Sequence, residues 1–237
     1  MRSSADAWIG RSGQAGETEA LRDAYAFAAD TWVADGAPNH YVVAPFLADL
    51  LEPWYGLGFA QMHVDAIRVT VVGEHRQPST GLSIRRGGPA DLEGVALPID
   101  NLIAEHQKRT PSFSSASQSE ATSRADWIGT LEAPDTIYFV AERAGEIVGH
   151  TLLYDPTPGL GVPDDAAYLA STATVAAVRG SGVGTALVAR ALATAQAEGR
   201  GTVLTNWRAT NLEAARFWSA RGFRPTFCRL HRAIASG

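Results

Sequence analysis

The feature that most constrains the fold is the stretch Thr174–Leu187, where an apolar run ends in a glycine-rich turn and a helical pattern follows at once. The turn reads Arg-Gly-Ser-Gly-Val-Gly over residues 179–184, and apolar residues then recur at helical spacing as far as Ala195. Glycines let backbone amides approach a ligand closely, and the first turn of a helix leaves its amides unpaired at the positive end of the macrodipole. The sequence therefore predicts a strand, a turn and a helix N-terminus that together bind an anion, best a phosphate.

Several kinds of glycine turn can be compared with this one. A dinucleotide-binding turn needs Gly-x-Gly-x-x-Gly, but Thr185 stands at the third glycine position and no acidic residue follows the next strand. A Walker loop needs Gly-Lys-Ser/Thr, and the turn has no lysine. A plain connection without a ligand stays open. The pattern that matches is Arg-x-x-Gly-x-Gly at Arg179, Gly182 and Gly184, which resembles the pyrophosphate signature of the GNAT family of acetyl-CoA-dependent N-acetyltransferases.

The chain after the turn also resembles the C-terminal half of a GNAT domain. A β-rich run over 202–207 leads to Asn211, a short helical segment, Gly222-Phe223 and a last strand over 227–234. The resemblance implies a mixed α/β fold (an α+β mixed sheet) with the element order β-α-α-β-β-β-α-β-α-β over residues 82–237.

This resemblance implies where acetyl-CoA binds. The turn and the Arg179 side chain would hold the pyrophosphate, and the backbone after the central strand would pair with the pantetheine arm. Asn211 is the family position for a further coenzyme contact, although it can equally be a helix cap. The coenzyme-binding residues so implied are Thr174, Val175, Ala176, Arg179, Gly180, Ser181, Gly182, Val183, Gly184, Thr185 and Asn211.

The N-terminal part of the chain repeats the C-terminal part. If Gly58-Phe59 is laid on Gly222-Phe223, Trp54 falls on Trp218, Arg68 on Arg232 and Pro45 on Ala209, all at one offset. We interpret residues 1–75 as a degenerate, partial GNAT-like copy. Its Glu17 and Glu19 stand where the phosphates would lie and would repel them. Residues 76–81 form the expected linker, and residues 82–237 the expected catalytic domain.

The catalytic groups are less clear from the sequence. Family members often use a tyrosine before Gly-Phe to protonate the leaving thiolate, but Trp218 stands there and an indole is no acid at neutral pH. Many also place a carboxylate on the central strand, and residues 166–178 contain none. The candidates for the base are Glu142, His150 and Asp155, with Tyr154 and Asp165 also open. Each has a structural alternative: hairpin surface for Glu142, a satisfied strand histidine for His150, a turn residue for Asp155.

Composition limits the partners. A chain of 237 residues with 46% hydrophobic and 19% charged residues can bury a large core. Its net charge of -5 argues against nucleic acid or an anionic membrane as partner. No apolar stretch is long enough for a membrane span and no signal-peptide pattern opens the chain, so we expect a cytoplasmic protein. The single Cys228 excludes a disulfide within the chain, and no Cys/His spacing indicates a metal site.

These observations favour an acetyltransferase that moves the acetyl group of acetyl-CoA to a primary amine of a small molecule or protein. Acetyl-CoA is then a co-substrate and no metal is needed. A non-catalytic acyl-CoA-binding or sensing protein is the alternative, motivated by Trp218 and the degenerate first copy. A purely structural protein is a third reading, and Gly182 and Gly184 argue against it. A homodimer is left open.

Overall fold

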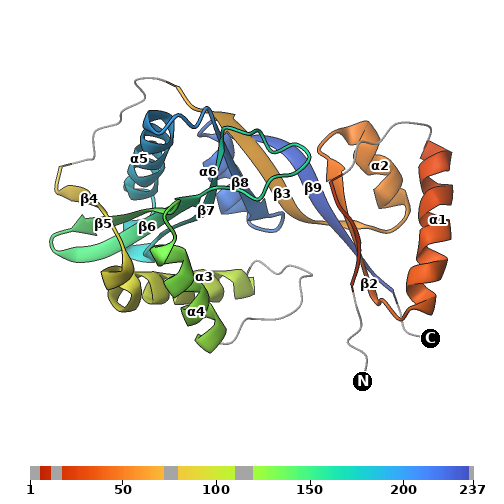
Figure 1. Ribbon diagram of the computed structural model, residues 1–237, viewed down its shortest axis with the longest axis horizontal. Helices are drawn as coiled ribbons and strands as arrows, with labels where there is room; N and C mark the ends of the chain where they lie inside the picture. Colours follow the sequence, from red (N-terminus) through yellow and green to blue (C-terminus); the bar gives the residue numbers. More distant parts are fainter. Residues whose placement is uncertain (1–5, 12–17, 72–79, 110–119, 235–237) are drawn as a thin grey trace.

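The structure is a computed structural model that describes residues 6–11, 18–71, 80–109 and 120–234. In this part of the chain the strands form a single mixed sheet of nine strands, in the order β1-β2-β9-β3-β8-β7-β6-β5-β4 (Figure 1). Helices pack on both of its faces, which is the mixed α/β fold expected from the sequence. Residues 76–79 of the expected linker and Glu17 lie outside the described residues.

The first third of the chain contributes three strands and two helices. In order they are β1 (Ala7–Ile9), α1 (Thr18–Ala34), β2 (Asn39–Pro45), α2 (Ala48–Gly56) and β3 (Ala60–Val69). Tyr25 of α1 and Trp54 of α2 pack on Cys228 and Leu230, which belong to the last strand of the chain. The aromatic side chains of this segment therefore join it to the C-terminus.

The remainder of the chain follows the expected order of elements. It consists of β4 (Leu82–Arg86), α3 (Leu97–Arg109), α4 (Glu120–Glu132), β5 (Ile137–Arg143), β6 (Glu146–Tyr154), β7 (Ala166–Thr174), α5 (Val183–Ala197), β8 (Thr202–Arg208), α6 (Leu212–Ser219) and β9 (Arg224–Ala233). Short 3-10 and π turns over Pro89–Ala96 lead into α3. The strand that precedes the glycine turn and the helix that follows it are confirmed.

Two apolar cores hold the helices on opposite faces of the sheet. Helix α5 buries Leu187, Ala191 and other small or branched residues against the strands, with Trp218 and Phe223 in the same cluster. On the other face Trp127 of α4 and the residues before α3 pack on Tyr138 and Val140. Figure 1 shows α5 on one side of the sheet and α3 and α4 on the other. The central strand β7 is thereby fixed from both sides.

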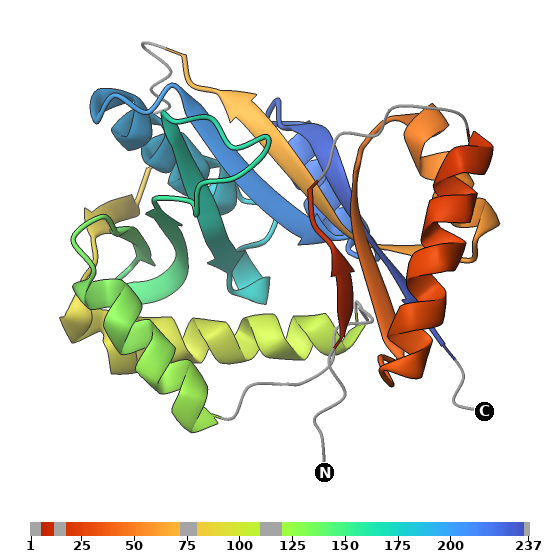
Figure 2. The same cartoon turned by 45° about the vertical axis from the view of Figure 1, so that its right-hand side comes forward.

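The strands of the two predicted segments interleave. The last strand β9 lies between β2 and β3, and β3 lies between β9 and β8 (Figure 2). The expected boundary near residue 76 therefore does not divide the sheet into two. The only cysteine, Cys228, is buried in β9 beside Val64 of β3.

The β2–β9 ladder and the β3–β8 ladder, which lie on either side of the β9–β3 pair, have the same register. A shift of 163 positions leads from β2 to β8 (202 minus 39), and a shift of 164 leads from β3 to β9 (233 minus 69). The pair Asn39–Ala233 corresponds in this way to Thr202–Val69, and the other pairs of the two ladders follow. This register matches Pro45 with Arg208 rather than with Ala209, because the connection after β8 is one residue longer than that after β2.

Candidate functional site

The central strands β7 and β8 separate partway along their length. Their parallel ladder covers only Ala166–Tyr168 against Thr202–Leu204, after which each strand continues beside its other neighbour. A bulge in β7, between the partners of Leu152 and Leu153, lies where the strands part. We call the diverging stretches, 170–174 of β7 and 205–208 of β8, the fork. Coenzyme or substrate can reach backbone groups here that a continuous sheet would have used.

The glycine turn lies at the end of β7 that borders the fork. Gly180 and Gly182 have φ angles of 77° and 90°, a conformation that favours glycine, and α5 begins at Val183. The amides of Arg179 and Ser181 bond to the carbonyls of Ala176 and Val178, just before the turn, at 3.1 Å each. The amides of the first helical turn, from Val183 to Thr185, have no intrahelical acceptor because they open the helix. These amides are the donors that the turn can offer to an anion.

Three arginines surround the turn. Arg143 donates to the Ser181 hydroxyl at 3.3 Å, and Arg221 donates to the Thr185 hydroxyl. Arg179 lies 3.7 Å from Glu213 of α6. The sequence named only Arg179, because Arg143 comes from the β5–β6 hairpin and Arg221 from the end of α6. No local motif marks either one, yet both add positive charge beside the amides.

The other expected coenzyme contacts are placed as follows. The Val175 amide donates to Val148 of β6 at 3.0 Å, so it does not point to the fork. Ala176 opens a short 3-10 turn that continues to Val178. The Asn211 side chain accepts a bond from the Ala214 amide at 3.0 Å and caps α6. That side chain has the capping role, and its amide nitrogen is the part left for a coenzyme contact.

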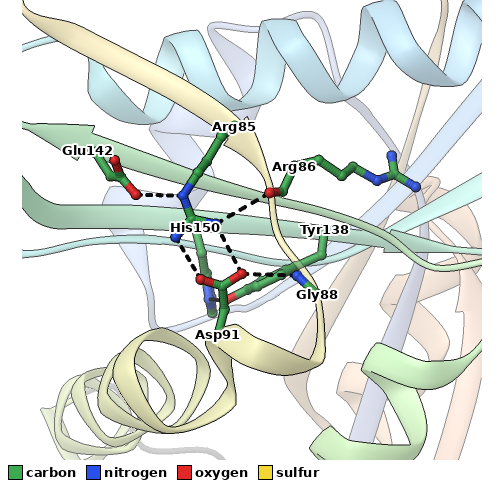
Figure 3. Close-up of polar contacts among 7 residues, drawn as sticks. All are labelled: Arg85, Arg86, Gly88, Asp91, Tyr138, Glu142 and His150. Atoms are coloured by element: carbon green, nitrogen blue, oxygen red, sulfur yellow. Dashed lines mark hydrogen bonds and ion pairs between the residues drawn. The ribbon is translucent and has the colours of Figure 1, made fainter.

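Glu142 and Asp155 are not brought to the fork. Glu142 lies on β5, two strands from β7, and accepts a bond from Arg85 at 2.6 Å (Figure 3). Arg85 also holds Asp91, and this bond lowers the pKa of that carboxyl group. Asp155 follows β6 and pairs with Arg200 at 2.5 Å, at the end of the sheet where β7 and β8 are still paired. Both carboxylates serve ion pairs away from the fork.

Tyr154, Asp165 and Trp218 also lie away from the fork. The Tyr154 ring packs on that of Tyr168 at 5.5 Å, and Asp165 accepts a bond from the Thr202 hydroxyl at 3.2 Å where β8 begins. Trp218 is 6% exposed and packs its ring 5.0 Å from that of Phe223. The indole is thus a core group.

His150 is the candidate that the structure places beside the fork. It lies on β6 opposite Ala173, is fully buried, and burial lowers its pKa to about 3. Its Nδ1 lies 3.0 Å from the Tyr138 hydroxyl, and its Nε2 lies 3.0 Å from the Ser171 hydroxyl on β7 (Figure 3 draws the tyrosine contact). The ring is therefore neutral and links a buried phenol to a hydroxyl at the fork.

The direction of this hydrogen-bond chain follows from Tyr138. Within the described residues its hydroxyl has only His150 as partner, so the phenol hydrogen is donated to Nδ1. Nε2 then carries the ring hydrogen and donates to Ser171, whose own hydrogen is left to point elsewhere. Ser171 was missed from the sequence, since a serine in a strand of small residues gives no signal without the facing histidine.

Among the described residues no group of three His, Cys, Asp or Glu side chains could hold a metal ion. The described helices also include none that is long and apolar enough to span a membrane.

The comparisons with known proteins match the chain to one family model. The family model described as acetyltransferase (GNAT) family matches residues 101–223, about half of the chain. A search of curated proteins found no match.

Solved structures show the same fold at low sequence identity. A GCN5-related N-acetyltransferase from Sphaerobacter thermophilus is 16% identical with a TM-score of 0.63, over 92% of this chain and 70% of that chain. A functionally unknown conserved protein from Staphylococcus epidermidis is 11% identical with a TM-score of 0.56, over 92% of this chain and 82% of that chain. A tandem GNAT protein from the clavulanic acid biosynthesis pathway is 15% identical with a TM-score of 0.57, over 91% of this chain and 70% of that chain.

Proposed function

The chain belongs to the GNAT family of acetyltransferases, and we propose that it transfers the acetyl group of acetyl-CoA directly to a primary amine of a small molecule or protein. The observation that carries this proposal is the position of the glycine turn. Gly180 and Gly182 place the first amides of α5 at the fork between β7 and β8, beside Arg143, Arg179 and Arg221. Amides at a helix N-terminus together with guanidinium groups form a strong site for a pyrophosphate.

The residues at the fork suit the remaining chemistry. The amine nitrogen attacks the thioester carbon, and the carbonyl oxygen gains negative charge as the C–N bond forms. The Ser171 hydroxyl, oriented by neutral His150, is a donor for that oxygen. The C–S bond then breaks, and the proton lost by the amine passes to the coenzyme sulfur or to water. His150 does not take this proton, because its pKa is about 3.

The N-terminal segment is proposed to be a second, degenerate copy of part of the same fold. The equal registers of the β2–β9 and β3–β8 ladders support this, since a repeat with exchanged last strands has this symmetry. The β3–β9 ladder supports it too. If each residue of a pair is replaced by its equivalent 164 positions away, the pair Ala60–His231 becomes the observed pair Ile67–Arg224, and the pair Val64–Cys228 becomes itself. The shared fold with a tandem GNAT protein over 91% of this chain agrees with it.

The domain division 1–75 and 82–237 is part of this proposal, with the last strand of each copy paired to the other copy. We further propose a cytoplasmic enzyme whose partner is a small-molecule or protein amine rather than nucleic acid or membrane. The net charge of -5 supports this choice of partner.

The test is a calorimetric titration of the whole chain with acetyl-CoA, together with two variants at Ser181. This side chain is exposed, and its φ angle is not among the positive ones, so substitution there adds no backbone strain. We expect one site per chain, at least tenfold weaker binding in Ser181→Glu, and near-normal binding in the uncharged Ser181→Gln. Absence of acetyl-CoA binding at millimolar concentration would overturn the proposal. If acetyl-CoA binds but no amine causes the release of the coenzyme thiol, the acyl-CoA sensor is favoured instead.

A further inference from the structure

A row of basic side chains crosses three neighbouring strands next to the fork. His63 of β3 pairs in register with Arg208 of β8 on one side and with Arg229 of β9 on the other. Residues opposite each other in a ladder share a face of the sheet. The neighbours Val64 and Trp207 point into the α5 core, so His63, Arg208 and Arg229 lie on the opposite face.

Two nitrogens of this row are buried and lack a hydrogen-bond partner. They are Nδ1 of His63 and Nε of Arg229, on directly opposed residues, and neither has a partner among the described residues. A buried polar atom left unsatisfied destabilises the fold, so such atoms in a native structure need an explanation. One acceptor atom placed between these strands would satisfy both.

The electrostatics of the row favour an anion. Burial and the two arginines lower the pKa of His63 to about 4, so the ring is neutral and can donate from Nδ1. Arg208 is anchored by Gln107 of α3 at 3.0 Å and 3.2 Å, and the Arg229 guanidinium lies 5.5 Å from the Trp8 ring centre. Two guanidinium groups are thus held on either side of a neutral histidine.

The nearby carboxylate already has a partner. Asp65 stands two residues after His63 on the same face, and Arg11 bonds it at 2.8 Å. Asp6 acts on the next row, where Tyr41 of β2 faces His231 of β9. Burial and the charge of Asp6 raise the pKa of Tyr41, and burial lowers the pKa of His231, an effect that Asp6 opposes. Among the described residues, no ion pair occupies Arg229, so its charge is available to a ligand.

We propose that this row binds an anionic group, a carboxylate or a phosphate, carried by the amine acceptor itself. The inference rests on the proposed function. Arg208 belongs to the stretch of β8 that borders the fork, and β3 is the next strand, about 4.8 Å away. An anion over His63 lies within about 10 Å of the fork, two strand spacings. An acceptor whose amine and anionic group are several bonds apart spans this distance.

The first test compares acceptors that differ only in the anionic group. We would measure kcat/KM of the full chain for 5-aminopentanoate, for 3-aminopropyl phosphate and for pentylamine, which has no anionic group. The expected result is at least a tenfold preference for one or both anionic amines, and the stronger of the two identifies the group. In Arg229→Gln the preference falls at least tenfold. The matched control is Arg224→Gln, an exposed arginine on the same strand, which keeps the preference.

A second measurement needs no turnover. The pKa of His63 is followed by NMR with and without 5-aminopentanoate or 3-aminopropyl phosphate, with assignment through His63→Gln. A bound anion raises that pKa by about one unit or more, and pentylamine leaves it unchanged. If the anionic amines neither shift His63 nor react faster than pentylamine while acetyl-CoA still binds, this inference is overturned and the proposed function stands. A His63 shift without any acetyl-CoA binding would retain the anion site and remove the proposed function.

Discussion

Ser171 stands at the end of a hydrogen-bond chain that a buried phenol begins. Tyr138 and His150 are 1% and 0% exposed, so the chain has a low-dielectric environment in which hydrogen bonds strengthen. Because His150 is neutral and donates from Nε2, Ser171 is held with its hydrogen directed away from the ring. This arrangement prepares a donor before substrate arrives, which is the condition for stabilising a developing oxyanion.

Replacement of Ser171 by alanine tests this role. We expect Ser171→Ala to lower kcat about tenfold to a hundredfold, because a donor to the oxyanion is lost. The dissociation constant for acetyl-CoA should change little, since the pyrophosphate contacts remain. Because the pKa of His150 is about 3, the pH profile of kcat between pH 5 and 9 should keep its shape in the variant. The rates come from thiol release and the affinity from calorimetry.

Thr194→Ala is the control, because within the described part of the chain this hydroxyl bonds only to the Arg190 carbonyl on α5. An unchanged kcat in Ser171→Ala would show that the hydroxyl does not touch the reacting atoms. A large loss in the control would instead point to a general effect of removing hydroxyl groups.

Residue chemistry alone does not say which of the candidate bases lie beside the fork. Glu142 and Asp155 are plausible bases by composition, but the sheet gives them arginine partners away from the fork. His150 was as good a candidate as these, and its contact with Ser171 depends on the β6–β7 register, which no local pattern reveals. A pair of groups on different strands becomes a site only when the topology brings them together.

At the scale of elements, local signals predicted most of the structure. The helix start at Val183 follows from the glycines before it, and the strand β7 covers the predicted residues 166–174. The turn at Gly222, with its φ of 78°, ends α6 as a left-handed glycine does. These features depend on backbone preferences within a few residues, so they can be read without knowing the rest of the fold.

The glycine turn allows a prediction for the element that it begins. An added Cβ at Gly182 would meet nothing within 4 Å, but the φ of 90° is strained for any L side chain. Gly182→Ala should therefore lower the free energy of unfolding by about 1–2 kcal/mol. In a chain of this length, that lowers Tm by about 2–4 °C per kcal/mol. Thermal unfolding followed by circular dichroism measures the shift.

Gly129→Ala is the matched substitution in an ordinary helical position. Gly129 lies within α4, has open space around its Cα and no positive φ, so alanine should stabilise the protein by about 0.5–1 kcal/mol. Opposite signs for the two variants are the expected result. Equal effects would mean that the turn relaxes freely and does not fix the amides at the start of α5.

For the whole molecule, the sequence predicts a repeat, but it does not predict that the strands of the two segments interleave. The matching of Gly58-Phe59 with Gly222-Phe223 predicts that β3 and β9 are equivalent. It does not say whether each pairs with the strand of its own segment or with that of the other, because both arrangements satisfy the same apolar pattern. The choice is made by contacts between residues more than 100 positions apart, such as those of the β3–β8 and β2–β9 ladders.

Because the strands interleave, we expect the first 75 residues to be necessary for the stability of the rest. Strand β9 has ladders only with β2 and β3 within the described residues, so removal of residues 1–75 leaves both of its edges unpaired. Its buried Cys228 and Leu230 would be exposed, and β8 would lose β3 and become an edge strand. We expect residues 76–237 alone to be insoluble or to unfold at least 10 °C below the full chain, as unpaired edges promote aggregation.

Co-expression of 1–75 and 76–237 as two chains separates loss of the strands from loss of the connection. The strands are then present and only the covalent link near residue 76 is broken, so the two chains should co-purify and regain most of the thermal stability. A soluble, monomeric 76–237 with the Tm of the full chain would show that β9 can pair within its own segment. The interleaved sheet would then be one of two arrangements open to the sequence, and the N-terminal strands would be dispensable.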